Sequence, residues 1–145
     1  MKIVLQRVKN ASVRVGETVV GQIERGYVVL VGFGVGDDEA SVDRAVEKIK
    51  KLRLFPDNEG KTNRSIYDID GELLVVSQFT LYADCRKGNR PSFTGAAPPD
   101  RAEALYKYFI TASKPHFAKV ESGSFGASMQ VELVNDGPFT VILEI

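Results

Sequence analysis

Cysteine, histidine and tryptophan are almost absent from this chain of 145 residues, which has one cysteine, one histidine and no tryptophan. The single cysteine, Cys85, excludes a disulfide within the chain and any zinc or iron–sulfur site built from cysteines alone. Because His116 is the only histidine, multi-histidine metal sites are excluded, and a Ser-His-Asp or Cys-His mechanism would depend on that one side chain. We therefore expect neither a metal ion nor a cofactor.

A surplus of charge of either sign is also missing. Lysine and arginine together number 19, as do aspartate and glutamate, so the formal net charge is +0. Any anionic partner must therefore be held by a local patch rather than by the whole surface. The N-terminal apolar run is too short for a signal peptide, and no window approaches the ~18 apolar residues of a membrane span. These absences predict a soluble protein of the cytoplasm with no membrane partner.

The length and the apolar pattern predict a single domain, residues 1–145, of the α+β class. Period-two alternation and β-branched runs predict strands at residues 3–8, 13–15, 18–23, 27–33, 72–78, 129–133 and 139–145. A turn at Asn135–Pro138 is expected to join the last two. Because the strands cluster without regular helical crossovers, we expect a largely antiparallel sheet or a barrel-like β core.

Two helices are expected beside these strands. The first follows Asp37 and Asp38, which stand where an N-cap and a favourable contact with the helix dipole are expected, and it carries an apolar stripe from Val42 to Leu52 with basic residues at its end. The second is expected to begin at Pro99, end before Pro115 and bury a stripe that includes Tyr108. The irregular stretch between residues 83 and 99 is long for a loop of a compact domain, and such loops are usually functional or mobile.

Ser77, Gln78, Phe79 and Thr80 stand at the end of an apolar strand and are the first candidates for chemistry. Strand alternation is expected to place Ser77, Phe79 and Leu81 on one face and Gln78, Thr80 and Tyr82 on the other, where the strand meets the long loop. From composition alone, a solvated sheet face explains these residues better than a site does.

The long loop carries three cations in five residues: Arg86, Lys87 and Arg90. Such a run is usually a solvated surface, although arginine and lysine on a loop also suit contacts with phosphate. A nucleophile pair of Cys85 and His116 is a further alternative, but nothing in the sequence brings the two side chains within hydrogen-bond reach.

Three segments taken together resemble the motifs of the bacterial-type D-aminoacyl-tRNA deacylases. They are the N-terminal MKIVLQRV of residues 1–8, the SQFTL of residues 77–81 and the NDGPFT of residues 135–140. Each motif is weak alone, but their order and spacing match over essentially the whole chain. Phe139 departs from the pattern, because the family more often has valine there.

The resemblance implies a homodimer that hydrolyses the ester joining a D-amino acid to the terminal adenosine of tRNA. It implies that the Gly137-Pro138 peptide is cis and enters the partner subunit's site, where its main-chain oxygens exclude the side chain of an L-amino acid. Arg7 matches a family arginine that helps to hold this motif. The segment Ser77–Thr80 matches the segment that lines the family's pocket. Glycine has no side chain to reject, so partial hydrolysis of glycyl-tRNA is expected.

Two mechanisms remain open. The Thr80 hydroxyl is a nucleophile by position, but no base is evident near it. Alternatively, the ribose 2′-hydroxyl of the tRNA helps to activate water, while Gln78 and the main-chain amides of Phe79 and Thr80 position the ester and stabilise the oxyanion. A rival function from another class is a non-catalytic nucleic-acid-binding dimer that uses the same basic loop.

Overall fold

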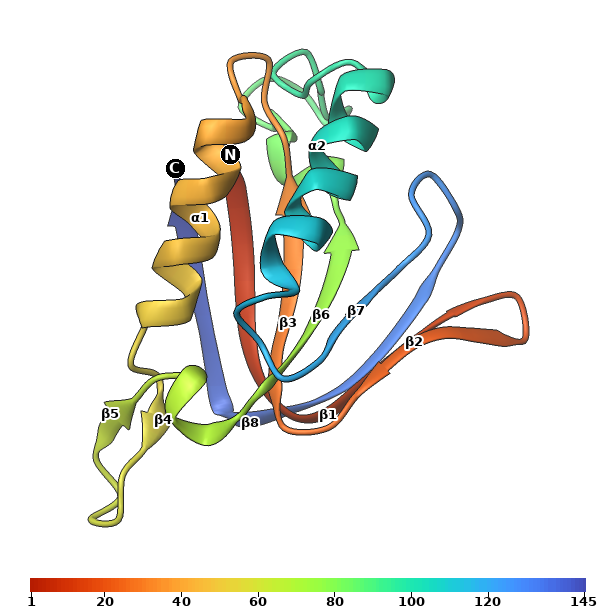
Figure 1. Cartoon of the computed structure of the whole chain (residues 1–145). Coiled ribbons are helices and arrows are strands. Elements are labelled where there is room, and N and C mark those ends of the chain that lie inside the picture. Colours follow the sequence, from red (N-terminus) through yellow and green to blue (C-terminus); the bar gives the residue numbers. More distant parts are fainter.

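The computed structural model describes residues 1–145. Both helices lie on one face of a strongly curved β-sheet (Figure 1). The strands run in the order β2-β1-β3-β6-β7, and β8 pairs with β1 outside this order. Their bounds are β1 Lys2–Val15, β2 Thr18–Ile23, β3 Gly26–Gly32, β6 Glu72–Ser77, β7 Val120–Ser122 and β8 Gln130–Glu144. A separate small hairpin, β4 Phe55–Pro56 and β5 Thr62–Arg64, projects from the body. The predicted α+β class, with a barrel-like β core and two helices, is confirmed.

The sheet is mixed rather than purely antiparallel. Strand β1 pairs antiparallel with β2, β3 and β8, whereas β3 with β6 and β6 with β7 are parallel pairs. Helix α1, Glu39–Lys51, lies between β3 and β6 in the chain, and α2, Pro99–Ser113, lies between β6 and β7. The expectation that helical crossovers are lacking was therefore wrong, because parallel neighbours require a long connection and each helix supplies one.

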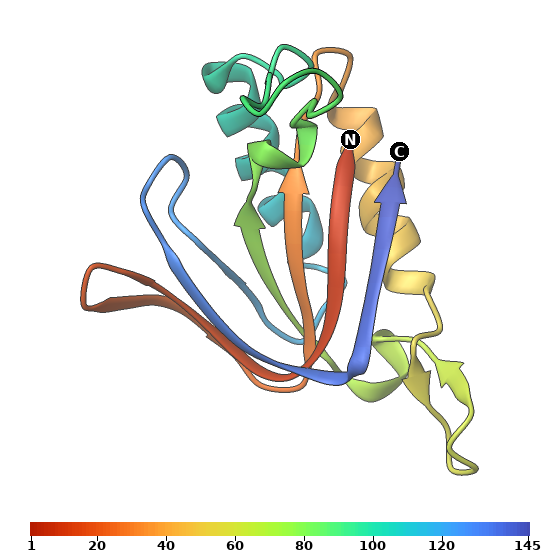
Figure 2. The same cartoon turned by 180° about the vertical axis from the view of Figure 1, so that it is seen from behind.

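The last strand, β8, is continuous, so the predicted turn between two terminal strands was also wrong. Both halves of β8 pair with the long strand β1, and the two strands bend together (Figure 2). The register shifts between Gln6 and Val8, which pair with Thr140 and Asn135, so Asp136–Phe139 loops out opposite the single residue Arg7. Because β1 offers an unbroken partner on both sides, the ladder resumes after this bulge instead of reversing.

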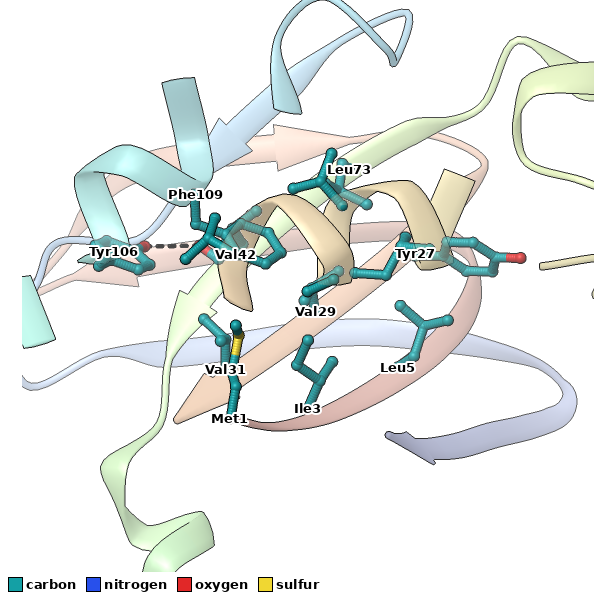
Figure 3. Packing of buried hydrophobic residues seen from close by; sticks show 14 of the residues in the cluster. Met1, Ile3, Leu5, Tyr27, Val29, Val31, Val42, Leu73, Tyr106 and Phe109 are labelled. Carbon is teal, nitrogen blue, oxygen red and sulfur yellow. Dashed lines mark hydrogen bonds between the residues drawn. The ribbon is translucent and has the colours of Figure 1, made fainter. Parts of the chain in front are cut away.

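The main core lies between the helices and the sheet (Figure 3). Of the two candidates for the N-cap of α1, Asp38 is the cap, since its carboxylate accepts the Ser41 amide at 2.8 Å, whereas the Asp37 carboxylate accepts the Gly34 amide. In α2 the expected burial of Tyr108 was wrong: Tyr108 is 37% exposed, and Tyr106 is buried in its place. The Tyr106 hydroxyl lies 2.8 Å from the Val75 carbonyl oxygen, an acceptor that the sheet supplies inside the core. No helix has both the length and the apolar composition needed to cross a membrane.

Candidate active site

A cavity of about 500 Å³ opens where β3 and β6 end, beside the first turn of α2 and residues 125–131. Most of its lining residues are apolar, and Ser77 and Gln78 supply its polar side chains. Phe79 lines it as well, so three of the four candidate catalytic residues meet there. The volume falls in the range of small-molecule sites, which are typically apolar with a few placed polar groups.

The chain leaves the sheet directly after Ser77, and the residues Phe79–Tyr82 form a short 3₁₀ helix, η2. The Gln78 amide donates to the Val31 carbonyl at 2.7 Å, and the partner strand β3 ends one residue later, at Gly32. With no further partner for a ladder, the backbone turns, so the expected alternation of faces through Tyr82 was wrong. Inside the turn, the Gln78 side-chain amide donates to the Thr80 hydroxyl.

Two glycines that the sequence pattern did not single out, Gly32 and Gly34, allow η2 to lie against the end of β3. A Cβ atom at Gly32 would lie 2.8 Å from the Gln78 carbonyl oxygen, and one at Gly34 would lie 2.6 Å from the Tyr82 hydroxyl. Both distances are shorter than a real side chain tolerates. Glycines at the end of a strand that mark a close backbone approach are the sequence signal for this arrangement.

The Tyr82 hydroxyl at the end of η2 faces an acidic group. It lies 3.5 Å from the Asp37 carboxylate, whose other contacts include the Gly34 amide at 2.6 Å. Burial, together with the negative charge of Asp37, raises the pKa of Tyr82 to about 12. Tyr82 is therefore a neutral donor at physiological pH, and it links η2 to the loop that follows β3.

None of the side chains that line the cavity is ionisable. The exposed Thr80 hydroxyl at its edge has the Gln78 amide as its only hydrogen-bond partner, and an amide is not a base. Cys85 is exposed and outside the cavity, and His116 lies 3.5 Å from the Lys50 ammonium. Any chemistry in this cavity must therefore use positioning, fixed dipoles and groups that the substrate brings.

Arg7 binds the bulge of β8 at residues Asp136–Phe139. Its Nε donates to the Asp136 carbonyl at 2.9 Å, and its Nη1 donates to the Leu54 carbonyl at 2.6 Å. Its guanidinium also lies over the Phe139 ring, 4.7 Å from the ring centroid, so the phenylalanine gives the cation a flat partner. Between Asp136 and Phe139, the Gly137-Pro138 peptide is cis. Gly137 has a φ of 146°, which favours glycine.

Asn135 closes the neck of the same bulge, a role that the sequence analysis missed. Its side-chain oxygen accepts the Phe139 amide at 2.6 Å, and its nitrogen donates to the Phe139 carbonyl at 3.4 Å and to the Thr140 hydroxyl at 3.3 Å. An asparagine that bonds to the backbone a few residues away is typical of turns, and this was the signal in the sequence. Gly137 and Pro138 are thus presented on a short loop that is tied on both sides.

Within one chain this loop and the cavity lie far apart along the sheet. Arg7 pairs with Tyr27 at the start of β3, whereas Ser77 pairs with Val31 near its end. Gly137 and Pro138 are exposed and do not line the cavity. The structure therefore places the candidate catalytic segment and the candidate chirality-selecting loop at opposite ends of β3.

The basic loop lies on the η2 side of the cavity. Arg86 forms two side-chain hydrogen bonds with the Asp84 carboxylate, at 2.9 and 2.7 Å, which lower the pKa of that carboxyl. Lys87 and Arg90 form no ion pair. All three cations line a second, wholly polar cavity of about 540 Å³, together with Asp84 and Ser92.

Comparison with known proteins settles the ancestry of these features. The family model described as D-Tyr-tRNA(Tyr) deacylase matches residues 4–144. The chain belongs to this family. The D-aminoacyl-tRNA deacylase of Thermosipho africanus is 56% identical over 144 residues, covering 99% of this chain and 97% of the relative. That of Rhodopirellula baltica is 52% identical over 145 residues and covers both chains completely. The resemblance inferred from the three motifs is confirmed.

Two solved structures share the fold. One, named c-Myc DNA Unwinding Element Binding Protein, has a TM-score of 0.94 and 42% identity, and covers 100% of this chain and 99% of its own. The other, described as a probable eukaryotic D-amino acid tRNA deacylase, has a TM-score of 0.87 and 19% identity, and covers 99% and 98%. At that identity, the second comparison speaks for the fold alone.

Proposed function

We propose that this chain hydrolyses the ester between a D-amino acid and the terminal adenosine of tRNA, and so releases the free amino acid and the tRNA. The observation that carries the proposal is the cavity of about 500 Å³ that Ser77, Gln78 and Phe79 help to line, in a chain of the deacylase family. The mostly apolar lining suits amino-acid side chains of varied size. We place the reaction in the cytoplasm, where aminoacyl-tRNA is used, with no metal or cofactor.

In the mechanism we favour, water adds to the ester carbonyl carbon and the ribose oxygen leaves with a proton. The lack of any ionisable side chain around the cavity supports help from the ribose 2′-hydroxyl over a Thr80 nucleophile. Gln78 and the main-chain amides of Phe79 and Thr80 hold the ester and stabilise the oxyanion. An ester is already reactive, so positioning and fixed dipoles are sufficient means of catalysis.

Gly137 and Pro138 select the chirality in this proposal. Arg7 and Asn135 hold their loop rigidly, and main-chain oxygens at its tip form a wall beside the Cα of the bound amino acid. Such a wall rejects the L side chain and ignores the identity of the D side chain. Glycyl-tRNA, which carries no side chain, passes this wall and is hydrolysed in part.

The enzyme acts as a homodimer in this proposal, because the wall cannot reach the cavity of its own chain. The loop is exposed at the start of β3, and the cavity opens at the end of that strand. A second copy brings its Gly137 and Pro138 to this cavity, so that chirality is read only in the dimer. Arg86, Lys87 and Arg90 contact the phosphates of the tRNA, with Arg86 held in place by Asp84.

The test is to incubate the purified protein with matched D- and L-tyrosyl-tRNA and to follow the release of tyrosine. We expect release from the D form and little from the L form. Equal rates on the two enantiomers would contradict the proposal. Binding of both without release would support the rival function, a nucleic-acid-binding dimer without catalysis, which the name of the structural relative at 42% identity brings forward.

A further inference from the structure

An exposed aromatic pair lies at the apolar cavity, close in sequence to the residues of the basic cavity. The rings of Phe79 and Phe93 pack edge to face, with centroids 5.1 Å apart and planes inclined by 63°. Phe79 is 58% exposed and Phe93 is 36% exposed, so both rings of the pair reach the solvent. An edge-to-face pair covers at most one ring face, so the remaining faces are open to a ligand.

The position of the pair is as informative as its exposure. Phe79 lines the apolar cavity, and Phe93 directly follows Ser92, which lines the basic cavity. The Phe93 carbonyl accepts the Ala96 amide at 3.0 Å, and Ala96 pairs with Gly34 and lines the apolar cavity. Ser92 in turn pairs with Asp84, so the segment that carries Phe93 is anchored on both sides, and the aromatic pair is linked to the apolar cavity through Phe79 and to the basic cavity through the neighbouring Ser92.

The cations around the basic cavity show which ligand suits the aromatic pair. Arg86, Lys87 and Arg90 would attract phosphate, whereas the neighbouring rings offer nothing to phosphate and a flat apolar surface to a base. Cations that follow a backbone, next to exposed aromatic rings, are the arrangement by which proteins hold single-stranded nucleic acid. The tRNA 3′ end is single-stranded, so it brings both groups at once.

We propose that Phe79 and Phe93 form a stacking platform for the unpaired base that precedes the terminal adenosine of the tRNA. The inference rests on the proposed function and extends the substrate site beyond the aminoacyl-adenosine. The ester occupies the apolar cavity, the preceding base stacks on Phe93, and the phosphates on either side of that base run toward the basic cavity. Since every base has a flat face, the platform holds the 3′ end without reading its sequence.

The experiment compares Phe93→Ala with the unaltered protein on two substrates, D-tyrosyl-tRNA and D-tyrosyl-adenosine, a small ester without the preceding nucleotides. Removal of one stacking interaction should lower kcat/KM on the tRNA about 5- to 150-fold relative to the change on the small ester, mainly through KM. Phe93→Tyr keeps the ring and should restore the ratio. Tyr108→Ala removes another exposed aromatic ring, which bonds to Asp43 outside both cavities, and should leave the ratio unchanged.

A second arm removes the base instead of the ring. A tRNA that is abasic at the position before the terminal adenosine should lose the same factor with the unaltered protein and nothing further with Phe93→Ala. Equal losses by Phe93→Ala on both substrates would overturn the platform and place the ring at the adenosine or at the amino acid. An unchanged rate on tRNA would overturn it too. Failure of the unaltered protein on both substrates would instead refute the proposed deacylase activity.

Discussion

Removal of the Asn135 side chain should make the enzyme accept L-aminoacyl-tRNA more often. The Asn135 oxygen accepts the Phe139 amide at 2.6 Å and closes the neck of the loop that carries Gly137 and Pro138. In Asn135→Ala that bond is lost, although Phe139 is only half-buried and water can satisfy the freed amide. The loop should then leave its place as a wall more often, without unfolding of the sheet.

The size of the effect follows from the shortest of the three hydrogen bonds that the Asn135 side chain forms. A neutral hydrogen bond contributes about 0.5–1.5 kcal/mol net, which corresponds to a rise of about 2- to 12-fold in the fraction of displaced loops. In the proposed function only a displaced loop admits an L side chain, so hydrolysis of the L form should rise by the same factor. Arg7→Met removes charged bonds to the Asp136 and Leu54 carbonyls, each worth about 1.5–3 kcal/mol, so its effect should be larger, at least about 10-fold.

The assay measures initial rates on D- and L-tyrosyl-tRNA for each variant, together with its thermal unfolding. Asn10→Ala provides the matched control, because Asn10 is an exposed asparagine of β1 outside the bulge. The ratio of L to D rates should rise in the order Asn10→Ala, Asn135→Ala, Arg7→Met. A parallel fall of both rates in Asn135→Ala, with an unchanged ratio, would refute the idea that this side chain positions a chirality-selecting wall.

Three further predictions concern the core, the mechanism and the basic loop. Tyr27→Phe should leave the free energy of chemical unfolding unchanged or raise it by up to about 3 kcal/mol, because the buried Tyr27 hydroxyl has no hydrogen-bond partner. Tyr106→Phe should lower the free energy of unfolding by about 1–2 kcal/mol, because the Tyr106 hydroxyl contacts two carbonyls. Burial also raises the pKa of Tyr106 from 10.0 to about 12, so its contribution to stability should be complete below pH 10 and lost as the pH rises toward 12, a loss that Tyr106→Phe removes. Thr80→Ala should keep most of the activity while a tRNA ending in 2′-deoxyadenosine is cleaved poorly; an acyl-Thr80 adduct in mass spectra would reverse this conclusion. Joint replacement of Lys87 and Arg90 by alanine should flatten the salt dependence of tRNA binding by about 0.7–0.9 in slope for each phosphate that is no longer neutralised, and an unchanged slope would place the phosphate-binding cations elsewhere.

Much of the fold was accessible from local pattern. The capped helix after Asp38, the proline start of α2 and the strand at residues 27–33 follow from side-chain period and capping chemistry, which act within a few residues. The parallel pairing of β3 with β6 was not accessible in this way, because pairing is decided by which elements share a core. The position of Tyr108 was missed for the same reason: Tyr106 finds its carbonyl acceptors only after the sheet is assembled.

The candidate site shows the same division. The sequence places residues 77–80 at the end of an apolar strand, and the structure has a cavity there, but the geometry of this segment depends on where β3 ends and on the missing side chains of Gly32 and Gly34. Similarly, the sequence around residue 135 indicates a turn, and a turn was expected to end one strand and start another. The unbroken partner β1 instead keeps both flanks in a single strand, and what was expected as a hairpin becomes a projecting loop.

In the proposed function, one pocket must accept many different D side chains and must also reject every L side chain. Different parts of the molecule serve these two requirements. The cavity offers mostly apolar, unspecific walls and no charged group that would favour one side chain over another. The loop of Gly137 and Pro138 offers main chain, which every amino acid meets at its Cα, and Arg7 and Asn135 tie that loop on both sides. In the proposed dimer the loop and Gln78 of one cavity come from different subunits, because they lie at opposite ends of β3 in each chain, so changes that loosen the loop should alter selectivity and leave Gln78 in place. In the proposed function, enantiomer rejection therefore depends on how firmly the bulge is held, whereas catalysis depends on how closely η2 lies against the end of β3.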